Sequence, residues 1–231
     1  MTERQSSDLN GNVHPFVPLE FTPRSLAQSR TDAQEFYAAM QRRRTTRHFS
    51  SKLVPRDLIE LAIHTAGTAP SGAHQQPWTF VAIADAELKG RMRAAAEIEE
   101  HAFYNGRAPG EWLEALAPLG TDEVKTHMTD APWVVVLFRQ AYGLNTDGTK
   151  RTYYYTEESC GIAAGLFIAA IHQMGLVTLT HTPSPMAFLR ELLHRPINEK
   201  PMLVLPVGYP AENARVPDIA RKSLADIAIF R

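Results

Sequence analysis

The sequence predicts one mixed α/β domain, because four strand-like runs alternate with helical segments and no linker or internal repeat divides the chain. The helical segments repeat apolar residues at intervals of three and four. The strand runs are rich in aromatic and β-branched residues, and they cover 78–83, 133–138, 176–181 and 202–207. With 231 residues, the chain is long enough to bury a core without covalent cross-links.

The periodicity predicts five main helices, with two shorter ones broken by Pro118 and Gly120. Pro55 suits the first turn of the second main helix, and Gly67 ends that helix. The main helices are expected over 34–44, 54–66, 86–104, 153–174 and 186–193. Within the fourth, residues 160–171 are apolar but too few to span a bilayer, which predicts a buried central helix.

The remaining segments are expected to be irregular. Residues 1–30 are polar and rich in Ser and Pro, which predicts a partly ordered arm before a domain at 31–231. A polar loop is expected over 142–150. The last ten residues, 222–231, are apolar enough to bury.

Composition excludes several classes of protein. The net charge of −1 provides no overall basic field for nucleic acid or an anionic membrane. The single cysteine, Cys160, excludes an intramolecular disulfide and fits a reducing compartment. The N-terminal residues lack the apolar core of a signal peptide, so we expect a soluble, cytoplasmic protein.

Several common motifs are missing from the sequence. No GxGxxG follows a strand, and neither HExxH nor GxSxG occurs, so we expect no dinucleotide-binding unit of the Rossmann type, no metal site and no serine nucleophile elbow. Residues 143–150 (GLNTDGTK) approach a phosphate loop but reverse its Lys-Thr order. We interpret this segment as a turn.

Three clusters remain that could carry chemistry. Residues 42–47 (RRRTTR) form either a solvated surface or an anion site, because arginine matches phosphate oxygens with two donors; nucleic acid is a third possibility. Residues 70–74 (PSGAH) form either an ordinary turn or a loop whose backbone approaches a ligand. Glu100 and Tyr104 share a helix face, and Lys125 follows; together they form a solvent-exposed charged face or a grip on an amino-acid zwitterion.

The order of these motifs resembles the nitroreductase superfamily of FMN proteins and, within it, the iodotyrosine deiodinase family. The resemblance begins at about Arg42 and includes HTAGTAPSGAHQQPWTF, LVTLTHTPSP, VGYP and a late Arg-Lys pair. It implies an α+β fold in which a mixed sheet is surrounded by helices. It also implies an intertwined homodimer with FMN bound at the subunit interface.

The same resemblance assigns the cofactor contacts. The segments that match FMN-binding segments of the family contribute Arg43, Arg44, Thr45, Arg47, Pro70, Ser71, Gly72, Thr180, His181, Thr182 and Arg221. The segment at 70–72 is expected to reach the FMN of the partner subunit. Thr182 matches the catalytic position, whose hydroxyl bonds flavin N5 and favours transfer of single electrons.

The resemblance also assigns a substrate site under a lid at about 97–128. Its expected residues are Ala73, Glu100, Tyr104, Thr121 and Lys125, which bind the substrate phenolate and zwitterion. The implied reaction is FMN-dependent reductive dehalogenation, from iodotyrosine to tyrosine and iodide, with electrons from an unidentified reductant or reductase. His181 departs from the threonine expected in animal members, and the membrane anchor of those members is missing, which indicates a soluble bacterial type.

Two other functions remain open at this point. A general nitroreductase or quinone reductase that uses NAD(P)H would share the fold but would not need Glu100 or Lys125. A protein that binds flavin or halotyrosine with little turnover would keep the same residues. Formation of tyrosine from iodotyrosine distinguishes the three.

Overall fold

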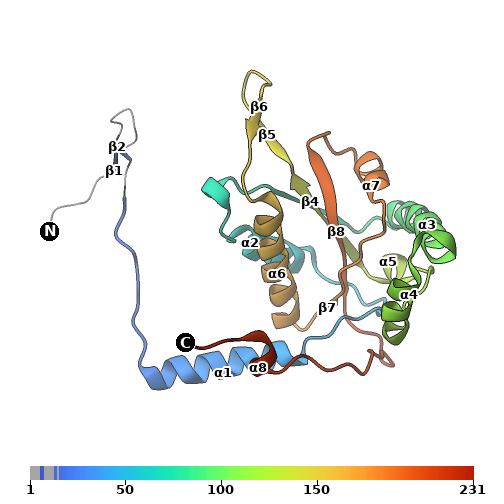
Figure 1. Cartoon of the computed structure of the whole chain (residues 1–231), viewed down its shortest axis with the longest axis horizontal. Helices are drawn as coiled ribbons and strands as arrows, with labels where there is room; N and C mark the ends of the chain where they lie inside the picture. The colour runs from blue at the N-terminus through green and yellow to red at the C-terminus, as the bar shows by residue number, and fades with distance from the viewer. Residues whose placement is uncertain (1–5, 8–12, 15) are drawn as a thin grey trace. The chain divides into compact units, whose positions relative to one another are not determined.

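The computed structural model describes residues 6–7, 13–14 and 16–231, and the chain divides into two compact units, 1–41 and 42–231 (Figure 1). In the first unit, β1 (Ser6–Ser7) pairs with β2 (Val13–His14), and α1 (Leu26–Arg42) begins eight residues before the helix expected at 34–44. The earlier start follows from Ser25, whose hydroxyl accepts a hydrogen bond from the Gln28 backbone N–H. The expectation for the arm at residues 1–5, 8–12 and 15 lies outside the described residues.

The second unit is built on a four-stranded sheet in the order β3-β4-β8-β7. Each neighbouring pair in it is antiparallel, and a single bridge from Thr45 to Thr178 runs parallel. The strands are β3 (Trp78–Ile83), β4 (Trp133–Gln140), β7 (Val177–Thr178) and β8 (Glu199–Gly208). Strands from the whole length of this unit join in one sheet, and helices lie between them in the sequence. This arrangement confirms the predicted α+β class.

Helices cover both faces of the sheet (Figure 1). On one face, α2 (Arg56–Gly67) and α6 (Thr156–Gln173) pack against Val135 and Leu205. On the other face, α3 (Ala86–Ala102), α5 (His127–Asp130) and α7 (Ala187–Leu192) pack against Val134 and Val136. Because side chains alternate along a strand, β4 supplies residues to both cores.

The predicted buried central helix is confirmed as α6. Cys160, Phe167 and Ile171 of this helix are completely buried. Phe167 also stacks on Phe80 of β3, with ring centroids 5.8 Å apart. Among the described residues, no helix combines the length and the apolar character needed to cross a membrane.

A segment of short helices follows α3. It contains a π-helical turn, η2 (Phe103–Arg107), then α4 (Gly110–Leu116) and the 3-10 turn η3 (Ala117–Leu119). Gly120 ends it in the left-handed conformation (φ 58°), which confirms the break expected there. No residue between 103 and 124 is buried, so this segment has no core of its own.

Two local expectations were wrong. Residues 142–150 are part of a hairpin, β5 (Tyr142–Leu144) and β6 (Lys150–Thr152), because Gly148 (φ 81°) closes a tight turn between them. The strand expected at 176–181 pairs regularly only as β7. The C-terminal tail, with α8 (Leu224–Ile227), leaves Ile229 84% and Phe230 82% exposed, so the described part of this chain does not bury it and its expected burial stays a prediction.

Candidate active site

A cavity of about 410 Å³ lies between the end of α3, the loop before α5 and the segment after β7. Its walls combine aromatic side chains from 103–112 with a set of polar and charged groups. The predicted site residues that line it are Arg47, Glu100, Tyr104, Thr121, Lys125, Thr180, His181 and Thr182. The fold thus brings together residues that are up to 135 positions apart, from Arg47 to Thr182.

The central feature of this cavity is a buried ion pair between Glu100 and Lys125. Glu100 Oε2 lies 3.1 Å from Lys125 Nζ, and the two residues are 8% and 3% exposed. Burial raises the pKa of Glu100, but the hydrogen bond from His181 and the Lys125 charge outweigh burial and leave that pKa below its ordinary value. A carboxylate and an ammonium group therefore face the cavity together.

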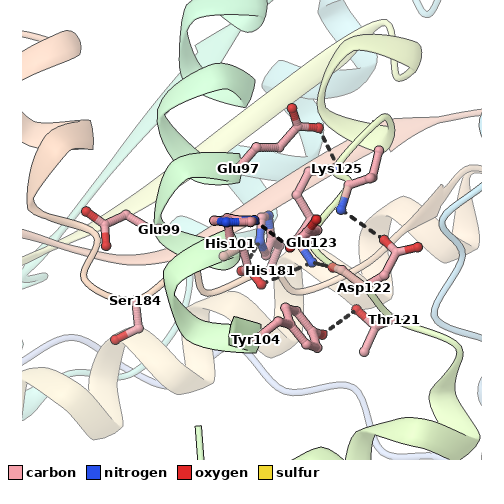
Figure 2. A network of polar contacts seen from close by, with 12 residues as sticks. Glu97, Glu99, His101, Tyr104, Thr121, Asp122, Glu123, Lys125, His181 and Ser184 are labelled. Carbon is pink, nitrogen blue, oxygen red and sulfur yellow. Dashed lines mark hydrogen bonds and ion pairs between the residues drawn. The ribbon is translucent and has the colours of Figure 1, made fainter. Parts of the chain in front are cut away.

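Two elements, α3 and the loop 121–125, hold this pair in place, and Figure 2 shows the contact between Lys125 and Glu97. Glu100 lies in the last turn of α3, and the Lys125 backbone N–H donates to Glu97 Oε1, one turn earlier, over 2.8 Å. The Lys125 ammonium also donates to the Asp122 carbonyl. The loop 121–125 is thereby anchored to α3 by both its backbone and its side chain.

Aromatic residues of the helical segment form the opposite wall. The Tyr104 hydroxyl donates to Thr121 Oγ1 over 3.4 Å (Figure 2), and the Lys125 ammonium lies 5.4 Å from the centre of the Tyr104 ring. Phe103 meets Trp112 edge to face, with centroids 5.0 Å apart. Burial raises the pKa of Tyr104, so its hydroxyl is protonated and available as a donor at neutral pH.

His181 contacts the ion pair and a second buried histidine. Its Nε2 lies 3.0 Å from Glu100 Oε1, and its Nδ1 lies 3.5 Å from Nε2 of His127. The backbone N–H and C=O of His181 both bond to Val204 of β8 at 2.9 Å. His127 was not predicted as a site residue, because nothing in a short helical stretch indicates a partner 54 residues away.

A second cavity, of about 280 Å³, adjoins the first through Arg47, which lines both. Its lining includes four arginines and no acidic residue. The predicted site residues in it are Arg43, Arg44, Thr45, Arg47 and Arg221. Burial, followed by repulsion from Arg221 and Arg44, lowers the pKa of Arg43, as expected for cations gathered in one place.

Backbone carbonyls keep these arginines together. Arg221 donates to the Arg43 carbonyl over 2.7 Å, and Arg44 donates to the Pro217 carbonyl. The late segment around Arg221 is therefore attached to the arginine-rich segment at the end of α1 by direct hydrogen bonds. Concentrated guanidinium groups of this kind are suited to bind phosphate.

The loop at 70–74 lines neither of these two cavities. It contains the 3-10 turn η1 (Gly72–His74), in which Ala73 has a positive φ of 48°. A Cβ on Gly72 would lie 2.5 Å from the Tyr154 carbonyl oxygen, so only glycine fits there. The structure thus leaves Pro70, Ser71, Gly72 and Ala73 apart from the other predicted site residues.

Comparisons with known proteins agree with one another. Residues 40–209 match the model of the nitroreductase family. An iodotyrosine deiodinase of Haliscomenobacter hydrossis is 51% identical over 93% of this chain and 96% of its own length. Human iodotyrosine deiodinase 1 is 40% identical over 98% of this chain and 78% of its own length.

Solved structures give the same result. A crystal structure of oxidized iodotyrosine deiodinase bound to FMN and 3-iodo-L-tyrosine has a TM-score of 0.74, with 27% identity over 85% of this chain and 97% of that one. A nitroreductase with bound FMN from Bacteroides fragilis has a TM-score of 0.63 at 20% identity, over 85% of this chain and 99% of that one, which shows a shared fold.

Proposed function

Because the chain belongs to the nitroreductase family and shares 51% identity with an iodotyrosine deiodinase, we propose that it is a flavin-dependent oxidoreductase that removes halogen from halogenated tyrosines. The observation that carries this proposal is the buried Glu100–Lys125 pair, which opens onto the same cavity as Thr182 and Arg47. A charge pair of this kind is complementary to the ammonium and carboxylate of an amino acid.

The two adjoining cavities fit FMN. Arg43, Arg44 and Arg221 provide the donors that a phosphate requires, and Arg47 connects this cluster to the larger cavity, where the flavin ring would lie. When bound and reduced, FMN supplies two electrons which, with one proton, convert a carbon–halogen bond into a carbon–hydrogen bond and release halide. Thr182 lines the larger cavity and would donate its hydroxyl to flavin N5.

The chain's own residues bind and orient the substrate. Glu100 would accept the substrate ammonium, Lys125 would donate to its carboxylate, and Tyr104 with Thr121 would complete the grip. The segment 97–128, which we name the lid, would order over the ligand and exclude water. These contacts are remote from the reacting carbon, so they select amino acids without taking part in the chemistry.

We further propose that two copies of the chain form the complete site. Pro70, Ser71, Gly72 and Ala73 line neither of the two cavities described above, which supports their donation to the FMN and substrate of a partner subunit. Exposed apolar side chains at Ile219, Leu224, Ile227, Ile229 and Phe230 provide a surface that such a partner would cover. A separate reductant or reductase would supply the electrons.

A cytoplasmic location is also part of this proposal. Cys160 is a free and buried thiol, which suits the reducing conditions of the cytoplasm. Burial raises the pKa of this thiol to about 12, so it stays protonated and unreactive at neutral pH.

An anaerobic single-turnover experiment tests the function. We would reduce the FMN-loaded protein with dithionite, add 3-iodotyrosine, and follow the flavin absorbance and the tyrosine formed. Reoxidation of the flavin with one tyrosine per FMN is expected. Flavin that stays reduced without tyrosine would instead favour a general nitroreductase or a binding protein, and a protein that cannot bind FMN would contradict the assignment.

A further inference from the structure

Four buried polar side chains form a continuous row behind the cavity. His127 contacts His181, His181 contacts Glu100, and Glu100 contacts Lys125, with successive distances of 3.5, 3.0 and 3.1 Å. The two histidines are 5% and 8% exposed, and their rings meet edge to face with centroids 5.1 Å apart. The resemblance assigns the segment of His181 to FMN, but the His181 ring itself contacts Glu100 and His127.

The ionised carboxylate of Glu100 determines which atom donates in each hydrogen bond of this row. An ionised Glu100 only accepts, so His181 must carry its proton on Nε2. A neutral His181 then presents an unprotonated Nδ1, which accepts from the Nε2–H of His127. Burial keeps both imidazoles neutral: it lowers the pKa of His127 to about 3, and it lowers the pKa of His181 despite the nearby Glu100.

We propose that His181, whose tautomer is set by Glu100 and whose Nδ1 accepts from His127, is a positioning residue that holds Glu100 ionised and turned toward the substrate ammonium. This inference rests on the proposed function. The backbone of His181 is fixed to β8 through both of its bonds to Val204, so the ring is a rigid anchor. Glu100 can therefore keep its bond to His181 through Oε1 while Oε2 changes partner from Lys125 to the ligand.

This arrangement explains how Glu100 can exchange Lys125 for the substrate ammonium while its buried carboxylate always keeps a partner. When Lys125 turns to the substrate carboxylate, Glu100 retains the His181 donor and gains the ammonium. Without His181, Lys125 would be the remaining hydrogen-bond donor to the Glu100 side chain. Breaking the contact with Lys125 would then cost free energy, because the buried carboxylate would lose its last partner. The other charged or titratable groups that act on this row are Arg47, Arg93, Glu97 and Tyr104.

The protonation pattern is tested first, on the protein without substrate. Nitrogen-15 NMR of histidine-labelled, FMN-loaded protein near neutral pH should show His181 as the neutral Nε2–H tautomer. The His127→Gln variant identifies the resonances of His127, because they disappear from its spectrum. A cationic His181, or a neutral His181 with its proton on Nδ1, would overturn the proposal.

The positioning role is tested by substitution. His181→Phe removes the donor, and His181→Gln keeps an N–H that can reach Glu100. We expect His181→Phe to raise the Kd of 3-iodotyrosine about 10- to 100-fold, as for loss of a hydrogen bond to a charged group, with the Kd of FMN changed less than about threefold. His181→Gln should restore most of the affinity, and exposed His64→Gln serves as the control.

The pH dependence separates positioning from a merely structural role. Because His181 helps to lower the Glu100 pKa, the acid limb of 3-iodotyrosine binding should move to higher pH in His181→Phe. Equal loss of FMN and substrate affinity, with no rescue by glutamine and no shift of that limb, would overturn the proposal. Failure of the wild-type protein to bind 3-iodotyrosine would overturn the proposed function instead, and the NMR result would still decide the His181 tautomer.

Discussion

At Lys125 the chain places an ammonium group almost completely out of water. Such burial is costly unless the charge is paired, and here Glu100, the Asp122 carbonyl and the Tyr104 ring surround it. Buried ion pairs of this kind are weak contributors to stability, because desolvation offsets their attraction. The pair is therefore better explained by binding than by folding.

The Lys125→Ala variant tests this explanation. We expect the Kd of 3-iodotyrosine to rise about 10- to 100-fold, because the substrate carboxylate loses a charged donor, and the Kd of FMN to change less than about threefold. Titration of the FMN-loaded protein and of the apoprotein measures the two constants. Lys150→Ala, in the exposed strand β6, is the control. Equal weakening of both ligands would contradict the assignment of Lys125 to the substrate.

His127 predicts how stability depends on pH. Its pKa is about 3 in the folded protein and near 6.5 when unfolded, so protons bind the unfolded state more tightly. The stabilisation is complete above about pH 6.5 and is lost as the pH falls toward 3, at roughly 1.4 kcal/mol per pH unit. Urea unfolding at about pH 7 and pH 5 should show a loss about 2 kcal/mol smaller in His127→Gln than in the wild type. His64→Gln should keep the wild-type loss, and an unchanged loss in His127→Gln would disprove the prediction.

Among the elements, the lid differs from the rest of the second unit in how few of its residues are buried. α3 is capped by Asp85, whose carboxylate accepts from the Leu88 N–H over 2.7 Å, and its Met92 and Ala96 are completely buried. From 103 to 124, by contrast, every residue is at least partly exposed, and a π-helical turn replaces regular helix. Segments with few buried contacts open at low free-energy cost. The lid is thus attached at both ends and weakly held in between.

Hydrogen exchange tests this difference. We expect amides at 103–124 to exchange faster than those of α6, and to slow about tenfold or more when 3-iodotyrosine binds the FMN-loaded protein. The ligand supplies the contacts that the segment lacks by itself. Exchange in α6 should not change and serves as the internal control. A lid that is equally protected with and without ligand would rule out ordering by the substrate.

On the scale of the whole molecule, two features of the single chain call for a second copy. The loop at 70–74 lines neither of the two cavities described above, and the apolar tail after Arg221 is exposed. Both are resolved if a second copy covers the tail and receives the loop. Burial of apolar surface would then stabilise the assembly by roughly 25 cal/mol per Å².

Charges in the tail should therefore disrupt the assembly. In the variant Ile227→Asp with Ile229→Asp, sedimentation should show a monomer, or a dimer that is weaker by at least tenfold, because charges resist burial. FMN should bind more weakly in the same variant, since each cofactor site would lose the partner's loop. Ile197→Asp, an exposed position before β8, should leave both properties unchanged. A wild-type protein that sediments as a monomer with tightly bound FMN would contradict the proposed dimer.

The sequence allowed most of the second unit to be predicted, because its signals are local. Strand β3 and helices α3, α6 and α7 lie within a few residues of their expected positions. The hairpin at 142–152 was not predicted, since each of its strands is only three residues long. Regular pairing of β7 with β8 covers only Val177 and Thr178, and beyond them His181 alone bridges to β8.

The sequence by itself determined the fold class and the set of chemical groups, through apolar periodicity and through motifs that resemble a known family. Only the tertiary structure decided which of these groups meet. It placed His181 against Glu100, added His127 behind it, and separated the loop at 70–74 from both cavities. The physical reason is that periodicity records which face of an element is buried. Contacts between residues 54 or 81 positions apart depend instead on how those elements pack.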